Sequence, residues 1–95
     1  MRQYRVAVVE EVAGLDHRGM VRYRARPDLA GAVKADTPGH AKRLLKLALP
    51  DDKRFQGLTV VSIALREHTV VHVIVRSAHL TAAAQIPGRV YKAHR

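Results

Sequence analysis

A single amphipathic helix pattern, flanked on both sides by strand patterns, is the feature that most constrains the fold of this chain. Thr37-Pro38 marks the helix start, because threonine is a good N-cap and proline is tolerated at the first helical position. Pro50 ends the pattern. Between them, apolar residues recur at the spacing of a helix face that packs on a sheet, at Ala41, Leu44, Leu45 and Ala48. The sequence therefore predicts one main helix over about residues 38–49.

Alternating apolar and polar residues before the helix predict strands over residues 2–12 and 20–26. The loop between them contains two glycines, so the two strands are expected to form an antiparallel hairpin. Pro27 interrupts the second strand because proline cannot donate to the ladder, and a short strand is expected to resume near Val33.

After the helix, residues 58–67 and 69–77 predict a second hairpin and complete the order β-β-α-β-β. An antiparallel sheet with one main helix on one face is a two-layer α+β sandwich. A short C-terminal helix can begin after Ser77. The expected organisation is a single compact α+β domain over residues 1–87, followed by a basic C-terminal tail over residues 88–95.

The alternation also suggests which sheet face the helix covers. We expect the arginine side chains of the first hairpin to lie on the open face of the sheet. The face expected beneath the helix carries Val6, Val8, Val21 and Tyr23.

Charge is the unusual feature of the composition. The 95 residues include 17 Lys and Arg against 8 Asp and Glu, which gives a net charge of +9. Twelve of the cations are arginine, whose planar guanidinium suits phosphate. A GC-rich genome would also enrich arginine, alanine and valine, so composition alone does not place this charge on a binding surface. A polyanionic partner, either DNA or RNA, is the expectation that the excess favours.

The most regular group of cations is a row of arginines on the second strand. Arg22, Arg24 and Arg26 alternate, so their side chains share one face at intervals of ~6.6 Å. Such a row can follow a phosphate backbone, although a solvated face that discourages edge pairing would look the same. No acidic residue follows Glu67, so the C-terminal third adds further cations. The predicted nucleic-acid-binding residues are Arg5, Arg22, Arg24, Arg26, Arg76, Arg89, Lys92 and Arg95.

Two further surfaces are candidates for binding. A secondary basic face lies on the helix, away from its apolar stripe, at Lys42, Arg43 and Lys46. The strand over residues 69–77 is largely apolar on both faces, and an exposed apolar strand invites sheet extension or dimerisation. The second face of that strand is a possible homodimer or protein interface, at Val70, His72 and Ile74.

The sequence does not predict an enzyme, a cofactor or a metal site. There is no cysteine, and neither Ser62 nor Ser77 lies in a G-x-S-x-G motif. No glycine-rich phosphate loop occurs. His68 and His72 are four residues apart, but on a strand this spacing is ~13 Å, too far to share one zinc ion.

No apolar stretch has the length of a signal peptide or a membrane span, so we expect a cytoplasmic protein without membrane contact. The expected function is that of a small, non-enzymatic nucleic-acid-binding accessory or regulatory protein. The alternative is a protein–protein adaptor or assembly subunit that associates through its apolar strand.

Overall fold

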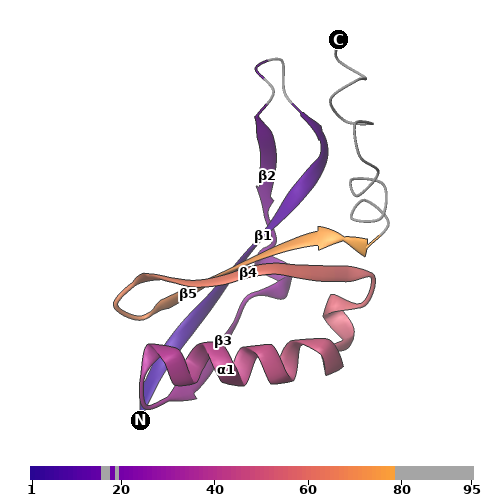
Figure 1. Ribbon diagram of the computed structural model, residues 1–95. Helices are drawn as coiled ribbons and strands as arrows, with labels where there is room; N and C mark the ends of the chain where they lie inside the picture. The colour runs from indigo at the N-terminus through magenta and orange to yellow at the C-terminus, as the bar shows by residue number, and fades with distance from the viewer. Residues whose placement is uncertain (16–17, 19, 79–95) are drawn as a thin grey trace.

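The computed structural model describes residues 1–15, 18 and 20–78 of the chain (Figure 1). Five strands and one α-helix occur in this part, in the order β1 (Arg2–Leu15), β2 (Val21–Ala25), β3 (Gly31–Ala35), α1 (Pro38–Ala48), β4 (Leu58–Glu67) and β5 (Val70–Ser77). The predicted elements are therefore confirmed, with boundaries that differ by at most a few residues. The expected C-terminal helix, the domain boundary at residue 87 and the basic tail lie outside the described residues.

Short 3₁₀ turns join several of these elements. Pro27–Leu29 forms one between β2 and β3, which is why the second strand is interrupted there and then resumes. Two more, Leu49–Asp51 and Lys53–Phe55, connect α1 to β4. No α-helix in the described part of the chain has the length and apolarity needed to cross a membrane.

The strands form one mixed sheet in the order β2-β1-β5-β4. The N-terminal half of β1 pairs with β3 and its C-terminal half with β2, so both lie along the same edge of β1. The expected all-antiparallel sheet is wrong in one respect, because β1 and β5 pair in parallel. The reason lies in the connections. The chain leaves β3 at one edge of the sheet, passes through α1 and enters β4 at the other edge. The β4–β5 hairpin then places β5 between β4 and β1.

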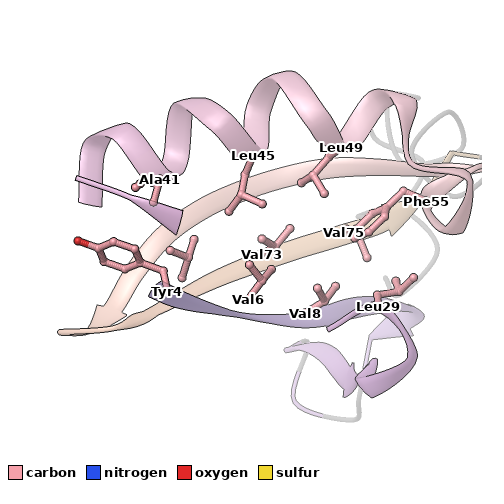
Figure 2. Packing of buried hydrophobic residues seen from close by; sticks show 12 residues of the cluster. Tyr4, Val6, Val8, Leu29, Ala41, Leu45, Leu49, Phe55, Val73 and Val75 are labelled. Carbon is pink, nitrogen blue, oxygen red and sulfur yellow. The ribbon is translucent and has the colours of Figure 1, made fainter. Parts of the chain in front are cut away.

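The core lies between α1 and one face of the sheet. Successive strand residues point to opposite faces, and the even positions of β1 and the odd positions of β5 point toward the helix (Figure 2). Ala41 and Leu45 of the predicted helix stripe are buried, whereas Ala48 is exposed and Leu49 in the following turn is buried instead. The other main buried residues are Tyr4, Val6, Val8, Leu29, Phe55, Val71, Val73 and Val75.

The prediction that Val21 and Tyr23 lie beneath the helix is wrong. Tyr23 pairs with Glu11 of β1, an odd position, and so lies on the sheet face opposite α1 with half of its surface exposed. Val21 is also exposed. Alternation shows which residues of a strand share a face, but only the pairing register decides which face meets the helix.

Candidate nucleic-acid interface

The predicted arginine row is present, but on the opposite face from the one expected. Arg22 and Arg24 of β2 pair with Val12 and Glu10 of β1, which are even positions and so belong to the helix side of the sheet. Arg5 is an odd position and lies on the other face. The structure therefore separates Arg5 from this row, which lies on the β1–β2 hairpin beyond the region that α1 covers (Figure 1).

Two arginines of the row bind a buried carboxylate. Glu10 is only 9% exposed, and its Oε1 atom accepts hydrogen bonds from Arg26 Nη1 at 2.5 Å and Arg24 Nη2 at 3.2 Å. Arg26 also donates from Nε and Nη2 to the two carboxylate oxygens of Asp28, at 3.0 and 2.8 Å. Arg26 therefore holds two carboxylates at once and is committed to the fold.

The pKa values of these groups agree with that geometry. Burial raises the pKa of Glu10, but the hydrogen bonds from Arg26 and Arg24 outweigh it and hold the pKa below its ordinary value of 4.5. The pKa of Arg26 is raised, first by its hydrogen bonds to Asp28 and then by the one to Glu10. Both partners thus keep their charges at neutral pH and neutralise each other.

Arg76, another predicted phosphate contact, is also paired. Its Nε atom donates to Glu11 across the β1–β5 ladder, and this hydrogen bond raises the pKa of Arg76. Arg22 is not free either, because it takes part in a further interaction within the structure. Arg89, Lys92 and Arg95 lie outside the described residues. Of the predicted phosphate contacts, Arg24, Arg26 and Arg76 are therefore neutralised by carboxylates.

The cations of the helix differ from these arginines. Lys42, Arg43 and Lys46 form no ion pair with any group in the described ranges, although α1 holds them close together. Their helix starts where the sequence predicts, because the backbone N–H of His40 donates to Thr37 Oγ1 at 3.0 Å and caps the first turn. The helix thus presents three cations that the described part of the fold does not neutralise.

These three side chains line a groove between α1 and the edge strand β4, with a volume of about 720 Å³. We call it the α1–β4 groove. Its remaining walls are mainly apolar and come from Gly39, Leu49, Pro50, Val60, Val61, Ser62 and Ile63. The pairing of β4 with β5 shifts register between Val60 and Ser62, and Val61 in between is 40% exposed. The groove therefore combines a cationic wall with an apolar floor.

The sequence indicated the basic wall but not the floor. Lys42 and Lys46 are four residues apart and repel each other slightly, by a few tenths of a kcal/mol, which an anion between them would reverse. Nothing in the periodicity of residues 58–67 indicates the irregularity at Val61. The floor could not be assigned without knowing that β4 lies at the sheet edge beside α1.

The residues of the predicted protein interface lie in the middle of the sheet. β5 pairs with β1 on one side and β4 on the other, so both of its backbone edges are already hydrogen-bonded. Val70, His72 and Ile74 alternate with the buried Val71 and Val73 and therefore lie on the face opposite α1. Sheet extension through β5 is thus not available, whereas contact through this face is.

No protein-family model, curated protein or solved structure significantly matches this chain.

Proposed function

We propose that this protein is a small, non-enzymatic accessory or regulatory protein that binds nucleic acid through the α1–β4 groove. The observation that carries this proposal is the contrast between two sets of cations. Arg24, Arg26 and Arg76 are neutralised by carboxylates, whereas Lys42, Arg43 and Lys46 line a groove together without such partners among the residues that the structure describes. We also propose a cytoplasmic location, with which the absence of cysteine is compatible.

The spacing of the groove cations suits a phosphate backbone. Lys42 and Lys46 are separated by four residues of helix, or ~6 Å along the axis. Successive phosphates of one strand are separated by a distance of the same order. Contacts of this kind position a nucleic acid without reading its sequence. The apolar floor adds a surface on which a sugar or a base can rest, with no aromatic side chain among its residues.

Charge reversal in the groove tests the proposal. The double variant Lys42→Glu/Lys46→Glu is expected to weaken binding of labelled single-stranded and duplex oligonucleotides at least tenfold, about 1.4 kcal/mol, because two attractive phosphate interactions become repulsive. Fluorescence anisotropy as a function of salt measures this effect. For duplex DNA the log–log slope should be reduced by ~0.9 for each phosphate that the variant no longer neutralises.

The matched control is Lys34→Glu/Lys53→Glu, which changes the net charge by the same amount at two exposed lysines outside the groove. Its affinity should fall much less than that of the groove variant. Equal losses in the two variants would mean that only the overall charge matters. Absence of binding by the wild-type protein at low salt would rule out the proposed function.

A further inference from the structure

The two sides of the α1–β4 groove differ in charge. The α1 side carries Lys42, Arg43 and Lys46. The β4 side belongs to residues 58–65, which include no charged residue. An anion placed against such an apolar wall would lose its hydration without compensation. The groove therefore suits an occupant that has phosphates along one side only and presents an uncharged, partly apolar surface to the other.

The β4 side also offers backbone groups. β4 is an edge strand, which pairs only with β5 among the strands that the structure describes. Every second residue of an edge strand directs its N–H and C=O away from the sheet. The groove reaches this outer edge, because Ser62 lines it although Ser62 lies opposite Ile74, on the sheet face turned away from α1. An occupant can thus hydrogen-bond to the β4 backbone while its charges contact α1.

The irregular pairing of β4 restricts what can use this edge. In its pairing with β5, β4 has one extra residue at Val61 and another at Arg66. Bulges of this kind break the regular spacing of the edge groups and protect a sheet against strand addition. An acidic peptide that adds as a strand needs a continuous ladder, whereas each base of a nucleic acid can use an isolated group. The edge therefore favours a nucleic acid over an extended peptide.

We propose that the groove binds single-stranded nucleic acid in preference to duplex, with phosphates along α1 and bases against Val60, Val61 and Ile63. In a duplex the bases are paired and stacked inside, so the apolar side of the groove would meet no free base face. In a single strand both the base faces and the base edges are free to bind. Because this preference concerns the same groove, it rests on the proposed function.

Fluorescence anisotropy of the full chain with three labelled DNA probes of about 12 nucleotides tests the preference. The probes are a single strand, a duplex of the same sequence, and an abasic strand that keeps the phosphates but lacks the bases. In about 0.1 M salt the single strand should bind at least tenfold more tightly than either of the others. Charge alone would favour the duplex over the single strand, because the duplex has more phosphates per unit length.

Val61→Ser removes part of the apolar surface that the bases would contact, at a residue that is 40% exposed. It should weaken binding of the single strand at least threefold and leave that of the duplex unchanged. Val21→Ser is the matched control, because it makes the same change at a valine of β2 that is 44% exposed and lies outside the groove. It should leave the affinity for all three probes unchanged.

Circular dichroism reports whether each variant folds, and the wild-type affinities for the three probes decide the matter if Val61→Ser does not. A duplex or an abasic strand that binds as tightly as the single strand would overturn the preference but not the proposed function. A folded Val61→Ser variant with wild-type affinity for the single strand would also overturn it. Absence of binding by every probe at low salt would overturn both. A polyglutamate peptide that binds more tightly than the single strand would show that the groove takes an acidic peptide instead.

Discussion

At the scale of single residues, arginine side chains occur in two different settings, bound to a carboxylate or lining the groove. Arg24 and Arg26 are bound to Glu10, and Arg76 is bound to Glu11, so these arginines join neighbouring segments of the sheet. Arg43 on α1 contacts no carboxylate within the described ranges. Arginine content and strand spacing alone therefore overstate the surface that is available to a polyanion.

The buried position of Glu10 leads to a prediction about stability. Glu10→Gln should lower the free energy of unfolding at about pH 7 by roughly 1–3 kcal/mol, because the two charge-assisted hydrogen bonds from Arg24 and Arg26 are weakened. The folded pKa of Glu10 lies below its ordinary value of 4.5. Its contribution is therefore complete above the unfolded pKa and is lost as the pH falls through the folded pKa.

Chemical denaturation at several pH values between about 7 and 2 measures this difference. The difference in the free energy of unfolding between the wild-type protein and Glu10→Gln, which we call the gap, should disappear toward low pH. Glu67→Gln, at an exposed glutamate without an ion pair in the described region, is the control and should show almost no gap at any pH. A gap of constant size for Glu10→Gln would mean that packing, and not charge, is the cause.

At the scale of elements, α1 both covers the core and carries the groove cations. Thr37→Ala should destabilise the protein by about 1 kcal/mol, because the N–H of His40 loses the hydroxyl that caps it. Thermal unfolding measures the loss, and Thr37→Ser, which keeps the hydroxyl, should restore most of it. The affinity for oligonucleotides should change little, since Thr37 is not a groove residue. A loss in Thr37→Ser as large as that in Thr37→Ala would show that the cap is not responsible.

The elements themselves could be predicted from the sequence, because their signals are local. Thr37-Pro38 and Pro50 bracket α1, and the interruption of the second strand at Pro27 follows from the missing N–H. The sequence could not predict which side chains of β2 point toward the helix side of the sheet. That depends on the pairing register, in which Tyr23 lies opposite Glu11 and not opposite a neighbour of Glu11. The groove floor and the ion pairs of Glu10 depend on the same long-range registers, which no local pattern in a single chain reveals.

At the scale of the whole molecule, charge is unevenly divided between the surfaces. The α1–β4 groove carries three cations without an ion pair in the described ranges, whereas Arg24 and Arg26 at the other end of the sheet bind carboxylates. Added salt should therefore weaken oligonucleotide binding through the groove. Between about 0.05 and 0.5 M the affinity should fall linearly on a log–log plot, because binding releases counterions from the nucleic acid.

Anisotropy titrations across this range of salt concentrations measure the slope. The groove variant Lys42→Glu/Lys46→Glu should flatten it, whereas the control Lys34→Glu/Lys53→Glu should keep most of the wild-type slope. Equal slopes for the two variants would mean that the groove is not the binding site.

The long first strand has a consequence for how the chain folds as it is synthesised. β1 extends over 14 residues and meets β2 and β3 within the next 20 residues of the chain, but its other edge pairs with β5, which begins at Val70. Until the ribosome has delivered that segment, a valine-rich strand edge can template pairing between nascent chains. Sheet closure depends on this late, sequence-distant pairing, which makes it the expected slow step of folding.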